Sequence, residues 1–449
     1  MRLRELAERV RHSLWFVPTI SVVVAAIAAL GLVGLSSALG EEADLPFVYG
    51  AGPEGARAML QAIGGSVITV AGTLFSITIV ALQLTSTQFS PRVLRNFLRD
   101  RANQVVLGVF IGTFTYSLLV LRTIRAEDET GGGAFVPGLA VTGGLLLAFV
   151  SIGTLIYFIH HVSVRIQVTT ILASVVTDAL GTIEHLATWS ERREDRGWFP
   201  ATAPARAAPP PPSGAIPASS ASHGARTVRV DRSGYLQLVD LRGLVEAAQE
   251  ANGRYALLVA PGAWVQAHAP LATFEAAPGA EPISDEDHAR ALADAMVLAP
   301  ERSLQQDAAF GIQQIADIGM KALSPSVNDP TTAINALDRI GQLLVAAGRA
   351  RDTPLAFADE SGTVRLEVPF PRFDELVALA FDGLRTYGAG TPAVAVHMAR
   401  VLTQLLATLP PGRHAPLRHE ARRLAEAAAS IEPETARREV LAAVEPLIG

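Results

Sequence analysis

A row of hydroxyl and amide side chains runs through an apolar stretch of the chain, residues 64–84, and ends just beyond it. Successive members are 3, 4, 3, 7 and 4 residues apart: Ser66, Thr69, Thr73, Ser76, Gln83 and Thr87. At 3.6 residues per turn, this spacing places all six on one face of a helix, where only Val80 interrupts the row. Such a face offers hydrogen bonding inside a membrane.

This polar row has two possible roles. Ser, Thr and small residues let membrane helices approach closely and hydrogen-bond to one another, and the neighbouring Gly65 and Gly72 suit such packing. Alternatively, the row lines a path for an ion or a small solute in an oligomer. Gln83 favours the path, because an amide in hydrocarbon costs free energy unless it is paired or hydrated.

Arginines follow the polar row in "FSPRVLRNFLRDR". Ser90 and Pro91 are typical of a helix start, and Arg92, Arg95 and Arg99 would share one side of that helix. The pattern predicts an interfacial helix whose arginines meet anionic lipid headgroups. If the polar row lines a path, these arginines would ring its cytoplasmic mouth and favour an anion.

A second candidate site lies in "LSPSVNDPTTAINALDR", where one helix stops and another begins. Asp329 followed by Pro330 predicts a capped helix start. Asn328, Asp329, Thr331 and Thr332 form either a structural turn or an anion site at the first-turn N–H groups. The structural turn is favoured, because the Asn328 and Asp329 side chains compete for those donors.

The composition excludes several classes of function. The 449 residues contain no Cys, so thiol catalysis, disulfides and Cys-ligated metals are excluded. A net charge of −6 argues against a nucleic-acid partner. The signatures of nucleotide-binding loops, zinc proteases and serine hydrolases are missing. We expect no enzyme, no cofactor and no metal.

Four stretches are long and apolar enough to cross a bilayer, and none contains Asp, Glu, Lys or Arg: residues 14–35, 63–84, 105–121 and 137–159. Arginines lie before the first span, between the second and third, and at position 165 after the fourth, whereas Glu41, Glu42 and Asp44 lie in an opposite loop. Positive charge marks the cytoplasmic side. The sequence predicts a multi-pass protein of a bacterial inner membrane with both termini in the cytoplasm.

The remaining chain predicts a cytoplasmic α+β domain that is mostly helical at its C-terminal end. After the transmembrane domain, residues 1–165, residues 166–198 have the periodicity of an amphipathic helix leaving the membrane. Residues 199–225 form a Pro/Ala-rich linker. A small β-containing subdomain is expected at residues 226–283 and a mainly helical one at 284–449, in which one helix is predicted from Ser303 to Leu323.

One hairpin pattern in the β-containing subdomain, "PGAWVQAHAPLATF", resembles the Gly-x-x-Val-x-x-Gly-x-x-Leu hairpins of barrel-sandwich hybrid domains. Ala267 or Ala269 is expected to replace the second glycine, and no acceptor lysine is present. Carriage of biotin or lipoate is therefore not expected.

Long stretches of the chain resemble one bacterial family of predicted membrane proteins, called domain of unknown function 2254. They are "SLWFVPTISVV", "GGSVITVAGTLFSITIVALQLTSTQFSPRVLRNFLRDRANQVVLGVFIGTFTYSLLVLR", "IYFIHH" and "FGIQQIADIGMKALSPSVNDPTTAINALDR". The resemblance covers nearly the whole chain and implies an integral inner-membrane protein. It brings no activity and no catalytic residues.

These features lead to one functional hypothesis and one rival. The first is an oligomeric channel-like or transport protein in the lipid bilayer, carrying an ion or small anion, with a cytoplasmic domain that assembles or gates it. The rival is a non-conducting, membrane-anchored scaffold or sensor whose cytoplasmic domain binds a partner or ligand.

Overall fold

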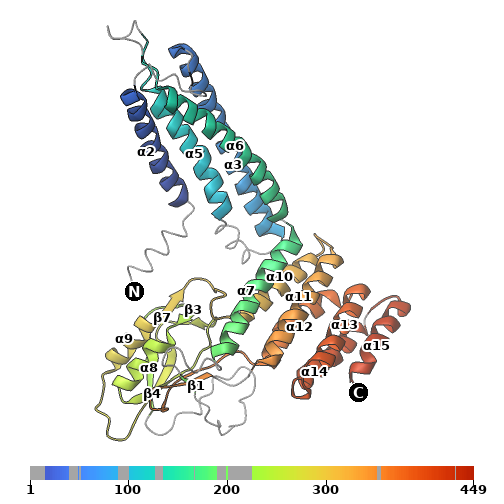
Figure 1. Cartoon of the computed structure of the whole chain (residues 1–449). Coiled ribbons are helices and arrows are strands. Elements are labelled where there is room, and N and C mark those ends of the chain that lie inside the picture. The colour runs from blue at the N-terminus through green and yellow to red at the C-terminus, as the bar shows by residue number, and fades with distance from the viewer. Residues whose placement is uncertain are drawn as a thin grey trace. The chain divides into compact units, whose positions relative to one another are not determined.

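The structure is a computed structural model, and it describes residues 16–39, 49, 52–88, 101–126, 135–165, 167–189, 199–200, 225–350, 355–429 and 431–448. The chain divides into two compact units, Met1–Thr170 and Ile171–Gly449. Figure 1 shows the elements of both.

The first unit contains four helices that are long and apolar enough to cross a membrane. They are α2 (Phe16–Leu39), α3 (Pro53–Gln88), α5 (Arg101–Leu121) and α6 (Gly138–Arg165). The four predicted spans are therefore confirmed. The helix of the second span is much longer than predicted, with 36 residues, because its helical backbone continues beyond the apolar stretch at both ends.

Helix α5 is the central helix of this unit. Half of its most apolar window is buried, against 11% for α2 and 22% for α3 and α6. Small residues explain this position: Gly108 and Gly112 form a G-x-x-x-G pair that lies against Ser21 of α2. Without side chains at 108 and 112, the two helix backbones approach closely.

Helix α6 packs on the same central helix through its own small residues. Tyr116 of α5 donates a hydrogen bond from its hydroxyl to the Ala140 carbonyl oxygen at 2.7 Å. Gly143 of α6 leaves room for that ring. Further along, the hydroxyls of Thr113 and Ser151 lie 3.1 Å apart and are buried.

The second unit contains two sheets. A six-stranded sheet has the order β1-β8-β9-β4-β6-β2. Among its described strand pairs, β4–β9 is parallel and the others are antiparallel. Its strands are β1 (Phe199–Pro200), β2 (Arg226–Arg229), β4 (Gly253–Leu257), β6 (Pro270–Ala276), β8 (Leu355–Ala358) and β9 (Val364–Val368). An antiparallel three-stranded sheet has the order β5-β3-β7, from β3 (Gly234–Val239), β5 (Trp264–Val265) and β7 (Met296–Ala299).

Helices α8 (Leu241–Glu250) and α9 (Asp285–Ala295) share one hydrophobic core with these sheets. Leu244 of α8, Leu292 of α9 and Leu236 of β3 are fully buried in it. Burial of their apolar surface stabilises this part of the chain.

Six further helices form the C-terminal part of the unit, as Figure 1 shows in orange and red. They are α10 (Ala308–Ala322), α11 (Pro330–Arg349), α12 (Phe373–Gly388), α13 (Pro392–Thr408), α14 (His414–Ala428) and α15 (Glu434–Ile448), with a short 3-10 turn at Pro411–Arg413. The mixed helical and sheet architecture agrees with the predicted fold class. Its cytoplasmic location stays a prediction, as do the proposed domain limits.

Helix α7 (Val168–Trp189) links the two units along the chain, because the division at residue 170 falls within it. Only residues 166 and 167 separate α7 from α6. Its apolar residues at helical spacing, among them Leu172, Val175 and Ala179, are buried. Thr182 also donates a hydrogen bond to the Leu304 carbonyl oxygen at 2.5 Å.

Candidate functional site

The candidate site is the outer face of α3. One face of this helix is buried in the first unit, through Leu60, Val67, Ala71, Leu74 and Ala81. The opposite face carries the polar row, whose members Ser66, Thr69, Thr73, Ser76 and Gln83 are all exposed. Thr87 lies on the α3 backbone, with its side chain outside the described residues. At about 100° per residue, the six positions fall within an arc of about 100°.

Two glycines of α3 show where no described helix of the first unit lies over this face. A Cβ added at Gly65 or Gly72 would meet nothing within 4 Å. A Cβ at Gly64, on the buried face, would instead contact Ser117 at 3.7 Å and Phe114 at 3.8 Å. At Gly65 and Gly72, the face of α3 is therefore not used for packing against the described helices of the first unit.

The outer surfaces of the other exposed spans have a different chemistry. Bulky aliphatic and aromatic side chains cover them, on α2 Ile20, Val23, Val24, Ile27 and Leu30, and on α6 Leu146, Phe149, Val150, Ile152 and Ile156. Such surfaces are suited to lipid chains. On α3, exposed Ile68, Phe75 and Ile79 lie on one side of the polar row, Ile77 lies on the other side and Val80 lies within the row. The surface of α3 differs from the others because polar side chains lie among these apolar ones.

Sequence reasoning missed an extension of this face. Ala58 and Ala62 are exposed and precede the row with the same spacing of three to four residues. Their spacing is visible in the sequence. Alanine is common on every face of a helix, however, so its position does not indicate a special surface as a polar residue in a span does. With them, the small and polar strip runs along most of α3.

The threonine hydroxyls of the row are partly satisfied by their own helix. Thr69 donates to the Gly65 carbonyl oxygen at 2.8 Å, and Thr73 donates to the Thr69 carbonyl oxygen at 3.1 Å. Each hydroxyl keeps acceptor capacity directed outward. Gln83 adds an amide with two N–H donors and an acceptor oxygen. The hydroxyl oxygens of this face can therefore accept further hydrogen bonds.

The predicted arginines Arg92, Arg95 and Arg99 lie outside the described residues. Arg101, which the interfacial-helix prediction included, is the first residue of α5. The third spanning helix therefore begins with a basic residue, at the end that follows the predicted interfacial helix.

In the turn before α11, the Asp329 side chain accepts hydrogen bonds from donors in the first turn of that helix. Asp329 accepts hydrogen bonds from the Thr332 backbone N–H at 3.1 Å and from the Thr332 hydroxyl at 2.6 Å. The Thr332 hydroxyl bond is the main cause that holds the pKa of Asp329 below its ordinary value. Asn328 adopts a left-handed backbone, with φ of 48°. This geometry favours a structural turn over an anion site, because a carboxylate already occupies the position near Thr331 and Thr332.

The hairpin between β5 and β6 revises one sequence expectation. His268, and not Ala267 or Ala269, takes the place of the second glycine, because it has a φ of +63°. The spacing agrees with this assignment. In the Gly-x-x-Val-x-x-Gly pattern, the second glycine lies three residues after the valine, and three residues after Val265 is His268. Gly262 itself has a φ of +90°.

Comparison with known proteins identifies the family of this chain. A family model described as predicted membrane protein (DUF2254) matches residues 11–404. The chain belongs to the DUF2254 family. The uncharacterized proteins Mb1321c of Mycobacterium bovis and Rv1290c of Mycobacterium tuberculosis are each 34% identical to it over 411 residues, covering 90% of this chain and 73% of the relative. No solved structure matches it.

The DUF2254 match includes all four spans and the whole α3 polar row. The resemblance inferred from the sequence is thus confirmed, and the chain is a predicted membrane protein. The family description assigns no activity, so a function has to be argued from the exposed face of α3.

Proposed function

We propose that this DUF2254 protein forms an oligomer in the inner membrane in which the α3 helices of several copies turn their polar rows toward a common axis. The row then lines a path for an ion or a small solute. The second unit, placed in the cytoplasm by the positive-inside rule, assembles or gates this path.

The observation that supports this proposal is the contrast between the outer surfaces of the spans. On α3, Thr69, Thr73 and Ser76 are exposed where α2 and α6 expose bulky aliphatic side chains. Polar side chains within spans usually face protein or a water-filled cavity, because lipid offers them no hydrogen bonds. Since no described helix of the first unit lies over Gly65 and Gly72 beside the row, a neighbouring copy or an aqueous path is a suitable surrounding for it.

The charges near the spans favour an anion as the permeant species. The four predicted spans hold no Asp or Glu that could form a cation-selective ring. Arg92, Arg95 and Arg99 follow the polar row in the sequence. At the cytoplasmic mouth of the path, they would attract anions and repel cations.

The connection between α6 and α7 supports a gating role for the second unit. Two residues separate these helices, and the division between the units lies three residues inside α7. Since α7 also buries Val175 and Ala179, a rearrangement of the second unit would pull on the end of α6.

A non-conducting scaffold or sensor is the second candidate. Glycine, alanine, serine and threonine on α3 are also what two membrane helices use to approach each other closely. In this case, the polar row joins copies of the chain without leaving an opening, and the second unit binds a partner or ligand.

Anion and cation flux across proteoliposomes tests the two candidates. We expect flux with the purified wild-type protein and a strong reduction with Thr73→Leu or Gln83→Leu. Ile27→Leu, on the exposed face of α2, is the matched control and should conduct normally. Absence of wild-type flux under every voltage and tension applied, together with loss of the oligomer in Thr73→Leu, would favour the scaffold.

A further inference from the structure

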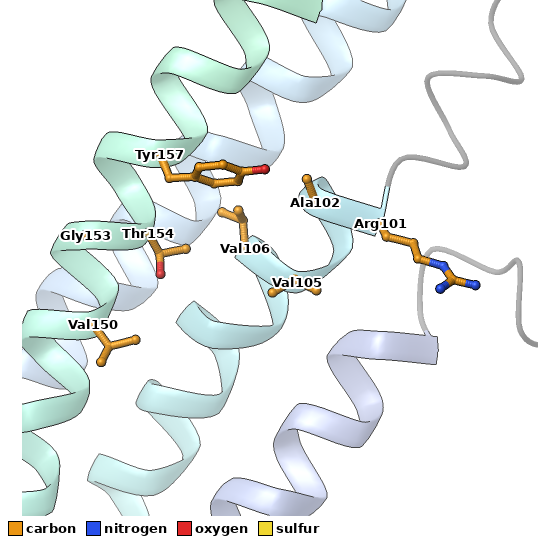
Figure 2. Close-up of a pocket in the computed structure, with 8 residues that line it drawn as sticks. All are labelled: Arg101, Ala102, Val105, Val106, Val150, Gly153, Thr154 and Tyr157. Carbon is orange, nitrogen blue, oxygen red and sulfur yellow. The ribbon is translucent and has the colours of Figure 1, made fainter. Parts of the chain in front are cut away.

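An open groove runs along the outer surface of the first unit, between the first turns of α5 and residues 150–157 of α6. Its volume is about 560 Å³, and its lining residues are Arg101, Ala102, Val105, Val106, Val150, Gly153, Thr154 and Tyr157. Figure 2 shows these residues. The groove is separate from the polar row of α3.

Small side chains on α6 create the groove. Beyond the buried hydroxyl contact of Thr113 and Ser151, α6 presents Gly153 and Thr154 toward α5. A Cβ added at Gly153 would meet nothing within 4 Å. Val106, which is 2% exposed, closes the groove from behind as part of the core of α3, α5 and α6.

The walls of the groove are apolar and face outward. Val105 and Val150 are each about half exposed, at 48% and 52%. Both lie within helices that are suited to crossing the bilayer. At that depth, an apolar groove open to its surroundings takes up hydrocarbon, because water would find too few polar partners there. An acyl chain is the occupant that these walls fit.

The end of the groove carries a polar and a basic residue. Figure 2 shows Tyr157 reaching from α6 toward the first turn of α5 at Ala102, while the guanidinium of Arg101 points away from Tyr157, beyond that turn. The Tyr157 ring stacks on His161, with 5.4 Å between ring centroids. Tyrosine and arginine at the end of a span are typical of the headgroup region. Arg101 is exposed and belongs to the arginine-rich side of the spans.

We infer that this groove binds one anionic phospholipid, with an acyl chain against Val105, Val106 and Val150 and the headgroup phosphate beside the Tyr157 hydroxyl, where a change of rotamer brings the long side chain of Arg101. The charge of the arginine selects an anionic headgroup over a zwitterionic one. Gly153 determines whether the chain fits. The lipid would fill the gap between α5 and α6 and stabilise their contact.

Native mass spectrometry of the full-length protein, titrated with phosphatidylglycerol or with phosphatidylcholine of the same acyl chains, tests this site. We expect tighter binding of one phosphatidylglycerol per protomer. Arg101→Gln should weaken that binding roughly fivefold and leave phosphatidylcholine unchanged. Arg125→Gln, the same charge change after the other end of α5, is the control and should have no effect.

A second pair of variants tests the groove itself. Gly153→Leu should weaken the binding of both lipids, whereas Gly31→Leu, at an equally open position on α2, should not. Val150→Trp fills the groove from an exposed wall if Gly153→Leu does not yield folded protein. Equal affinity for the two lipids overturns the headgroup assignment, and unchanged binding in the filled variants overturns the groove.

Discussion

Gly108 of α5 lies directly against Ser21 of α2. A Cβ added at Gly108 would stand 2.5 Å from the Ser21 hydroxyl oxygen, 3.2 Å from Ser21 Cβ and 3.5 Å from the backbone of Pro18. A change of rotamer can move the Ser21 hydroxyl, but it leaves the Ser21 Cβ in place, and a distance of 3.2 Å to that atom is too short for an ordinary contact. The close crossing of α2 and α5 depends on the missing side chain.

The first prediction concerns this crossing. Gly108→Val should destabilise the protein by about 1–3 kcal/mol, because the added methyl groups force the two helices apart. Thermal unfolding of the purified protein in detergent measures the effect as a lower midpoint. Gly31→Val adds the same groups where nothing lies within 4 Å, and its midpoint should match the wild type. Equal midpoints for the two variants would contradict the close crossing.

The second prediction uses the absence of cysteine from the chain. Single cysteines at Thr69, Thr73 and Ser76 should react with a water-soluble thiol reagent in intact membranes, because the reactive thiolate forms only where water reaches the side chain. A cysteine at Ile27 on α2, an exposed aliphatic position, should react much more slowly. Mass spectrometry of the labelled chain gives the two rates.

The same variants separate an aqueous path from simple packing. If α3 only joins copies of the chain, the cysteines at Thr73 and Ser76 should form disulfide-linked dimers on oxidation and stay unlabelled by the aqueous reagent. Labelling at Ile27 as fast as at Thr73 would show that the polar row has no special access to water.

The polar face of α3 could be predicted from the sequence because it depends only on helical periodicity. The sequence does not predict whether another helix covers that face, because this depends on how α2, α5 and α6 are arranged around α3. The glycines illustrate this limit. Gly108, four residues before Gly112, is in close contact, whereas Gly72, four residues before Ser76, is open. Both belong to patterns of two small residues four positions apart, and these patterns do not show which of them meets another helix.

The start of α10 shows a similar limit. The sequence favours a helix from Ser303, yet α10 begins at Ala308 and Asp307 caps it by accepting a hydrogen bond from the Phe310 N–H at 3.0 Å. Arg302 holds this carboxylate through both of its oxygens, at 2.8 and 2.9 Å. The ion pair with Arg302 therefore favours Asp307 as the helix cap. The spacing of apolar residues alone does not show this.

The third prediction concerns this ion pair. The Asp307 side chain is 1% exposed and that of Arg302 is 20% exposed, so Asp307→Ala leaves a largely buried charge without its partner and removes a helix cap. The expected loss is about 3–5 kcal/mol. Urea unfolding measures it. Glu301→Ala, an exposed carboxylate beside the pair, is the control, and a similar loss there would contradict a specific role for Asp307.

The fourth prediction concerns the pH dependence of stability and rests on Asp359, in the turn between β8 and β9. Burial alone would raise the pKa of this carboxyl group, but hydrogen bonds from Ser361, Arg365 and the Thr363 N–H lower it to about 2, from an ordinary value of 3.8. The Arg365 Nε lies 2.7 Å from Asp359 Oδ2, and both side chains are largely buried. The charged form of Asp359 is therefore stabilised in the folded state.

A carboxyl group whose pKa is lower in the folded state stabilises the fold above its unfolded pKa and loses that effect as pH falls toward the folded value. At pH 7, the free energy of unfolding of the wild type should be about 2 kcal/mol higher than that of Asp359→Asn. The difference should begin to shrink near pH 4 and be largely lost near pH 2. Urea unfolding of both proteins at pH 7, 5, 4 and 3 measures this difference in stability. If the difference stays constant down to pH 3, the contribution of Asp359 does not depend on its charge.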